Sequence, residues 1–185
     1  MTEEQRWRTA IHEAGHAVMA ELLNVKFDKV ILKFDPSNKS EGYISIIRKI
    51  GESDRTLENV GFVALAGSIA EICYLEPNGA WYIDRDARNA IQKIMDIYYY
   101  RDFYDNLTKE EKKNFIKFVL EEKKKLVFAF FNDAGTAHVT RHLARLLMRR
   151  NRLSQASVRS LNLRSRLKSR YAKQLREFAA KRQWI

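Results

Sequence analysis

The chain has 185 residues, 45% of them hydrophobic and 31% charged, with 7 glycines, 2 prolines and a net charge of +11. With so few glycines and prolines we expect long regular elements and not disorder, and the single cysteine, Cys73, excludes an internal disulfide framework and favours a reducing compartment. The N-terminus has no apolar signal region and no long uncharged apolar run follows, so we expect a soluble, cytoplasmic protein without a membrane span.

Hydrophobic periodicity predicts a mainly helical (α+β) chain with one small β-hairpin. Thr2 and Gln5 form a capping-box pattern, and good helix formers continue to about Leu23. Alternating apolar residues then predict two strands, 29–34 and 42–49, joined through a Pro-Ser-Asn turn.

The rest of the chain reads as helices. Residues 53–75 are apolar almost all round from Val60 onward, which predicts a buried helix. Thr108 and Glu111 form a second capping box, and Ser154 is a plausible helix cap. The predicted helices after residue 80 are 84–103, 108–131, 136–150 and 155–182.

The stretch IHEAGHAV carries the strongest chemical signal. His12 and His16 are four residues apart and therefore share one helix face, where both can bind one ion. Glu13 is turned about 100° away, beside the ion, where a general base belongs. Zinc held by two histidines and a carboxylate lowers the pKa of a bound water to about 7, and the glutamate takes its proton. Gly15, in mid-helix, indicates that another element packs closely here.

A third ligand has to come from elsewhere in the chain. Metzincins place a histidine six residues after the second one, but this position is Leu22, which excludes that class. Three acids are candidates: Glu71 in the apolar second helix, and Asp84 and Asp86 at the start of the third. The residues alone leave the choice open.

Four ordered segments, HEAGHAV, EGYISI, LAGSIAEIC and RDARNA, lie between residues 11 and 90. Together they resemble the peptidase domain of FtsH-type membrane AAA zinc metalloproteases. The resemblance implies a zincin-like helical metallopeptidase fold. It also implies that His12, His16 and Asp86 bind zinc, that Glu13 is the catalytic base, that Glu71 accepts a hydrogen bond from a ligand histidine, and that Gly42, Tyr43 and Ile44 bind an extended substrate.

The sequence departs from that family's pattern at Ser68, Ile72 and Arg85, and it contains no GxxxxGK[ST] phosphate loop. We therefore expect a stand-alone zinc metalloendopeptidase that hydrolyses unfolded or flexible proteins. It would act without ATP by itself, although an ATPase could deliver substrates in trans, and oligomerisation is compatible with the resemblance.

Basic residues gather in the second half. Residues 1–100 contain 12 Lys and Arg against 15 Asp and Glu, whereas residues 101–185 contain 22 against 8. We expect a metallopeptidase core at 1–103 and a helical, strongly basic part at 104–185 packed on it. The basic helices could bind nucleic acid or an acidic protein, including one dedicated substrate; in an alternative function the protein is a non-catalytic regulator that keeps the zinc fold. His138 and His142 also lie four apart, but a polar helix face explains them better than a second metal site.

Overall fold

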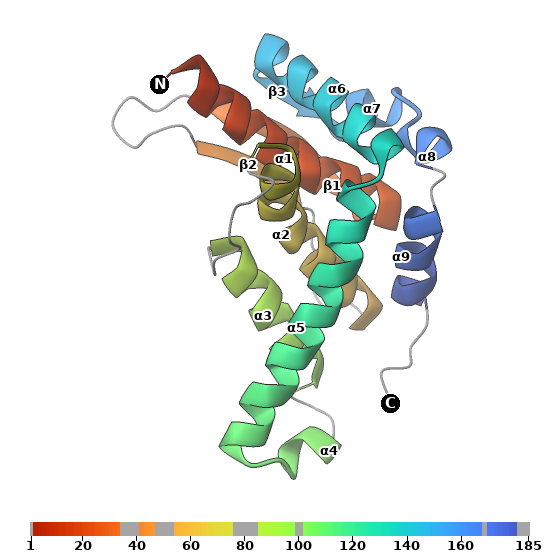
Figure 1. The fold of residues 1–185 in the computed structure, drawn as a ribbon. Helices are drawn as coiled ribbons and strands as arrows, with labels where there is room; N and C mark the ends of the chain where they lie inside the picture. Colours follow the sequence, from red (N-terminus) through yellow and green to blue (C-terminus); the bar gives the residue numbers. More distant parts are fainter. Residues whose placement is uncertain are drawn as a thin grey trace.

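The computed structural model describes residues 2–33, 41–46, 54–75, 85–98, 102–167 and 170–180. It confirms a mainly helical protein with one small antiparallel sheet (Figure 1). The elements are α1 (Glu3–Leu23), β1 (Phe27–Lys33), β2 (Glu41–Ile46), α2 (Asp54–Leu75), α3 (Arg85–Tyr98), α4 (Asp102–Asp105), α5 (Lys109–Phe131), α6 (Ala134–Arg150), β3 (Arg152–Ser154), α7 (Gln155–Arg159), α8 (Leu163–Arg166) and α9 (Arg170–Ala180).

Helix α1 lies at the centre, with α2 on one side and α6 on the other (Figure 1). Its predicted capping box is present, since Thr2 and Gln5 each accept a hydrogen bond from the other's backbone N–H. A Cβ added at Gly15 would lie 2.7 Å from the carbonyl oxygen of Ala66 and 2.8 Å from Cβ of Ala70. The close packing that this glycine predicted is therefore confirmed, and the partner is α2.

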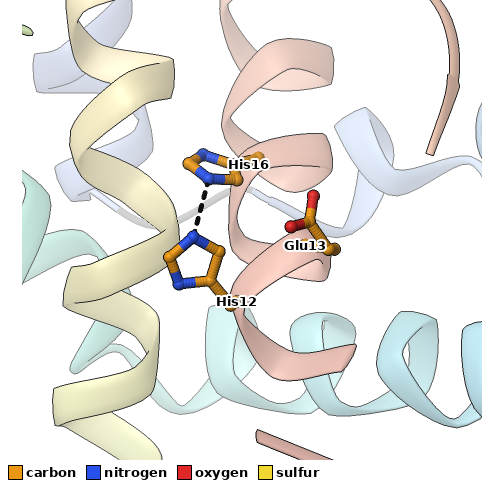
Figure 2. Close-up of side chains that lie close together, drawn as sticks. All are labelled: His12, Glu13 and His16. Carbon is orange, nitrogen blue, oxygen red and sulfur yellow. Dashed lines mark hydrogen bonds between the residues drawn. The ribbon is translucent and has the colours of Figure 1, made fainter. Parts of the chain in front are cut away.

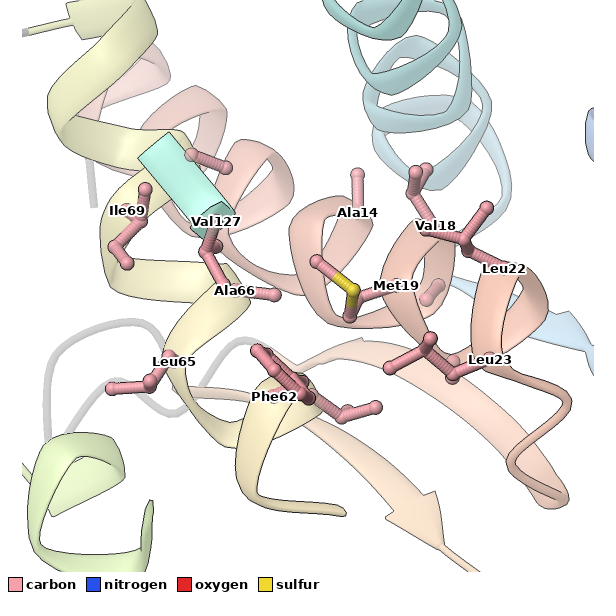
Figure 3. Close-up of a cluster of buried hydrophobic side chains, with 14 of the residues drawn as sticks. Ala14, Val18, Met19, Leu22, Leu23, Phe62, Leu65, Ala66, Ile69 and Val127 are labelled. Atoms are coloured by element: carbon pink, nitrogen blue, oxygen red, sulfur yellow. The ribbon is translucent and has the colours of Figure 1, made fainter. Parts of the chain in front are cut away.

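Helix α2 is buried over most of its length, as its apolar sequence predicts. Phe62, Leu65, Ala66 and Ile69 pack with apolar residues of α1 and α5 in the main core (Figure 3). Within the described residues, the segment Leu57–Leu75 has the length and a mean hydropathy of 1.2 found in membrane spans, but 61% of it is buried inside the protein. Burial of this kind is typical of the core helix of a globular fold.

The sheet has the strand order β2-β1-β3, with both pairs antiparallel. The hairpin of β1 and β2 confirms the prediction, with Val30 opposite Ile44. Strand β3 is an addition that the sequence did not predict; its Leu153 is buried opposite Val30. The C-terminal half thus covers one edge of β1, while β2 is the outer strand at the other side of the described sheet.

Helix α5 begins at its predicted capping box, Thr108 with Glu111, and ends at Phe131 as expected. It packs on α2 through apolar residues and one buried ion pair, in which Nζ of Lys123 lies 2.7 Å from Oε1 of Glu58. Helix α6 starts at Asp133, which caps it, and packs on α1. These contacts join the 104–185 region to the first half; the division into two domains at residue 103 stays a prediction.

One predicted helix is wrong in extent. The long helix at 155–182 is broken into α7, α8 and α9, because Asn162 adopts a left-handed conformation (φ 49°) and Ser160 ends α7. Serine and asparagine favour caps and turns over helix interiors. Ser154 does cap α7, as predicted. The described part of the helix predicted at 84–103 is helical, in α3 and α4, and residues 84 and 99–101 lie outside the described part, as do 47–49 of the predicted second strand.

Candidate metal centre

The two histidines of α1 face α2 with their Nε2 atoms close together (Figure 2). The ring centroids of His12 and His16 are 4.7 Å apart, and their Nε2 atoms are 3.1 Å apart. This arrangement follows from the four-residue spacing, which places both side chains on one helix face. Both residues are shielded from solvent: His16 is buried and His12 is only partly exposed.

Each ring is held through its other nitrogen. The backbone carbonyl oxygen of Val63 lies 2.6 Å from Nδ1 of His16, and a carbonyl can only accept, so Nδ1 donates. The Oε2 atom of Glu71 lies 2.9 Å from Nδ1 of His12 and accepts in the same way. In both rings Nε2 then points to the same place, where its lone pair would be available to a cation once its proton is displaced. Hydrogen bonds of this kind fix the tautomer of metal-binding histidines and increase their basicity.

Asp86, in the first turn of α3, completes a triangle of ligand atoms. Its Oδ2 lies 2.8 Å from Nε2 of His12 and 3.2 Å from Nε2 of His16. Bonds of about 2.0–2.1 Å in a tetrahedral zinc site separate the ligand atoms by about 3.3 Å. The observed triangle has nearly this size. Asp84, the other candidate at this helix start, lies outside the described residues.

The wall of the site on the α2 side is Gly67. A Cβ added there would lie 2.5 Å from Nε2 of His16 and 2.7 Å from Nε2 of His12. Any side chain at this position would thus fill the space onto which both nitrogens point. The sequence reading missed Gly67, although a glycine inside a helix is the same signal that was used for Gly15.

Glu13 lies beside the two rings and is turned away from the line that joins them (Figure 2). One ligand atom from each of His12, Glu13 and His16 lies within 4.8 Å of the others, a group that can hold a metal ion. The Glu13 side chain is buried, and its Oε2 has no hydrogen-bond partner within the described part of the chain. A buried carboxylate oxygen without a partner is costly and indicates a group that the protein alone does not supply.

Gly42 of β2 lies directly against Glu13. A Cβ at this position would be 2.3 Å from Cγ and 2.6 Å from Oε1 of Glu13. The outer strand of the sheet therefore runs past the carboxylate. Of the three predicted substrate-binding residues, the structure places Gly42 at the site and Ile44 two positions further along the same strand, paired with Val30. For Tyr43 the structure describes the backbone, which belongs to β2.

The charges of the site are strongly coupled. Burial lowers the pKa of His12, but hydrogen bonds to Asp86 and Glu71 outweigh it and raise that pKa to about 10. For Asp86, burial is outweighed by the hydrogen bonds to His12 and His16, which hold its pKa well below the usual range. Burial raises the pKa of Glu13, against the opposite effect of the two histidines. A cation bound here would displace the shared protons, so its affinity would increase with pH.

Arg8 is a further residue that the sequence reading did not identify. Its Nη1 lies 3.0 Å from Oε1 of Glu71, while the other oxygen of Glu71 accepts from His12. Arg8, Glu71 and His12 therefore form a hydrogen-bonded chain between the half-exposed rim and the ligand triangle. Glu71 thus contacts His12 and lies outside the triangle. His138 and His142 are on α6 and belong to no comparable group among the described residues.

No protein-family model matches the chain, and a comparison with curated proteins finds no match. The arrangement of His12, His16, Asp86 and Glu13 is therefore interpreted from its own geometry.

Asp86 is expected to contribute more to metal binding than Asp84. Asp86→Ala removes one of the three converging atoms. We expect the affinity for zinc to fall more than tenfold, because tenfold is the smallest loss typical of removing a residue that only hydrogen-bonds to a ligand. Asp84→Ala is the matched control, with an expected change below about twofold. Zinc titration against a competing chelator measures both, and a larger loss in the Asp84 variant would show that the ligand assignment is wrong.

Proposed function

We propose that this protein is a zinc-dependent metalloendopeptidase with a zincin-like fold, similar to the peptidase domain of FtsH-type proteases. The observation that carries the proposal is the convergence of His12 Nε2, His16 Nε2 and Asp86 Oδ2 beside a buried Glu13. The ordered sequence resemblance over residues 11–90 supports it independently of the geometry.

The donor set favours zinc among the common metals. Two imidazole nitrogens and one carboxylate oxygen are typical of catalytic zinc sites, which keep a fourth position for water or substrate, whereas magnesium and calcium favour sites made of oxygens. When bound, zinc supplies a Lewis acid that polarises a water molecule and the scissile carbonyl.

The protein's own residues provide the proton transfer. Glu13 takes a proton from the attacking water at its carboxylate and delivers it to the nitrogen of the leaving amine. Its burial raises its pKa, which makes the carboxylate a stronger base than an exposed one. Its place beside, and not within, the ligand triangle leaves it available for this role. Glu71 and the carbonyl of Val63 keep the histidine rings oriented throughout.

The position of β2 suggests how a substrate binds. An extended peptide that pairs with the outer edge of β2 would run past Gly42 and bring a peptide bond near Glu13. Edge pairing requires an extended backbone, so unfolded or flexible polypeptides are the expected substrates. A folded protein would need an ATPase in trans to unfold it first.

Metal removal tests the proposal. The purified protein is expected to contain about one zinc per chain, and to cleave an unstructured protein such as casein until a chelator removes the metal. Adding back zinc in slight excess over the chelator should restore cleavage. Metal content is measured by elemental analysis, and cleavage by gel electrophoresis and mass spectrometry of the products. A protein that folds and binds no zinc would contradict the proposal, and one that binds zinc but cleaves no unfolded substrate would favour a regulatory role.

A further inference from the structure

The outward face of α6 carries a row of arginines, Arg141, Arg145 and Arg149, which we call the α6 arginine row. All three side chains are exposed. Val139, Leu143 and Leu147, each two residues earlier, are buried. Two residues along a helix correspond to a rotation of about 200°, so the row faces away from the core and successive members rise by about 6 Å. Arg150 and Arg152 continue the exposed positive charge at the end of the helix.

Little in the described protein balances this charge. Residues 134–176 contain no Asp or Glu. No ion pair with a carboxylate is formed by Arg145, Arg149, Arg150 or Arg152 within the described residues. Arg141 contacts the ring of Tyr74 at 5.0 Å. Arg6 adds another cation here, because its Nη2 donates to the carbonyl of Met148 at the end of α6. Like charges gathered in this way repel one another and favour an anionic partner.

Helix α5 is also highly charged and serves as a comparison, because its charges are partly balanced within the helix. Its basic residues are all lysines, and they alternate with glutamates. Lys113, Lys124 and Lys125 lie within 3.9 Å, 2.9 Å and 2.6 Å of Glu110, Glu121 and Glu122. Residues 134–185 instead contain 11 arginines and 3 lysines. Arginine binds phosphate oxygens with a planar fork of two N–H groups, which lysine cannot do.

We propose that the α6 arginine row binds the phosphodiester backbone of a nucleic-acid duplex, without sequence preference. A row of single-sign charges that repeats along a straight helix matches a linear, regularly charged polyanion better than the scattered carboxylates of an acidic protein. Residues 134–150 contain no Phe, Trp or Tyr, and among the described contacts of the row only Arg141 lies against a ring, that of Tyr74, so the row offers little surface on which successive unpaired bases could stack. Of these anionic partners, the phosphodiester backbone of a duplex fits the row best.

The metal centre lies between α1 and α2, whereas Arg145 and Arg149 are on α6 at the other side of α1; Arg141, nearer the start of α6, contacts Tyr74 near the end of α2. Helix α6 packs on one side of α1, and α2, with Gly67 and Val63, packs on the other (Figure 1). A duplex bound at Arg145 and Arg149 would therefore lie on the side of α1 away from the ligand triangle. The inference does not rest on the proposed peptidase function, and either can fail without the other.

Salt-dependent binding of matched variants tests the inference. The probes are a labelled DNA duplex of about 20 base pairs, an RNA duplex of the same sequence and polyglutamate of similar charge, measured by fluorescence anisotropy between about 50 and 200 mM KCl. The triple variant R141Q/R145Q/R149Q should bind a duplex roughly tenfold or more weakly, with a salt slope smaller by about 2–3, because each phosphate contact contributes about 0.9. The control K113Q/K117Q/K125Q removes the same charge from exposed positions of α5 and should change the affinity less than about twofold.

Several results would overturn the inference. They are an absence of duplex binding at the lowest salt concentration, an equal loss in both triple variants, and binding of polyglutamate as tight as that of the duplexes. The two duplex arms decide between DNA and RNA as the source of the phosphates. Circular dichroism and thermal unfolding check that the variants are folded. If the glutamine triple is not, the three single variants are measured, each with an expected slope decrease of about 0.9.

Discussion

Glu13→Gln is expected to lower kcat for cleavage of an unfolded protein by about 10²–10⁴-fold while the protein keeps its zinc. Glutamine has the shape of the glutamate but cannot accept a proton at this position. The ligand triangle of His12, His16 and Asp86 is unchanged, so zinc content should match that of the wild type. The folded protein should also tolerate the change, because Glu13 has one buried oxygen without a partner in the described residues.

Glu21→Gln provides the matched control. Glu21 is also buried on α1, two turns further along the helix, where its Oε1 accepts from Nε2 of Gln155 at 2.9 Å and from Nε of Arg159 at 3.2 Å. This variant should keep full cleavage and lose thermal stability, the reverse of the Glu13 variant. Kinetics, elemental analysis and thermal unfolding on both proteins separate the two effects. Cleavage at the wild-type rate by the Glu13 variant would remove Glu13 from the mechanism.

Gly67→Ala is expected to abolish stoichiometric zinc binding, with a loss of affinity of about 100-fold or more. This is at least as large as the loss caused by removing a residue that hydrogen-bonds to a metal ligand. The added methyl group would lie at 2.5 Å and 2.7 Å from the two Nε2 atoms, well inside van der Waals contact. The rings must move apart or turn, and either movement destroys the converging geometry that tetrahedral bonds require.

Gly61→Ala, on the same helix, is the control for this change. The nearest atom to a Cβ at Gly61 is Cβ of Lys93 at 3.8 Å, an ordinary contact. Replacing a helical glycine where space is available should increase the free energy of unfolding by about 0.4–1 kcal/mol. Zinc titration and thermal unfolding measure both variants. Full zinc occupancy in the Gly67 variant would mean that the ion is bound away from the α2 wall.

The parts of the fold that the sequence predicted are those with local signals. The capping boxes at Thr2 and Thr108 fixed the starts of α1 and α5, and alternation at Val30 and Leu32 identified β1. The spacing of His12 and His16 likewise determined the shared face on which their Nε2 atoms meet. Each of these features depends on residues within about one helical turn or one strand.

The features that the sequence did not predict depend on contacts between distant segments. Strand β3 has only three residues and becomes a strand because β1 is there to pair with it. The break at Asn162 is set by a left-handed backbone; asparagine favours that conformation only weakly, so its presence alone does not say where a helix ends. The role of Gly67 exists only because α2 packs against α1 at this level, and Asp86 approaches the histidines across 74 positions of sequence. Only the resemblance to a family distinguished Asp86 from Asp84 at the sequence level.

The order in which the chain is synthesised gives the position of α6 a consequence for the nascent protein. All of the residues that form the ligand triangle and the base have left the ribosome once residue 86 has emerged, yet α6, which covers the opposite side of α1, begins only at Ala134. Until then the side of α1 that packs on α6 in the finished fold lacks this neighbour. The packing of α1 is therefore completed only after all of the site residues have been made.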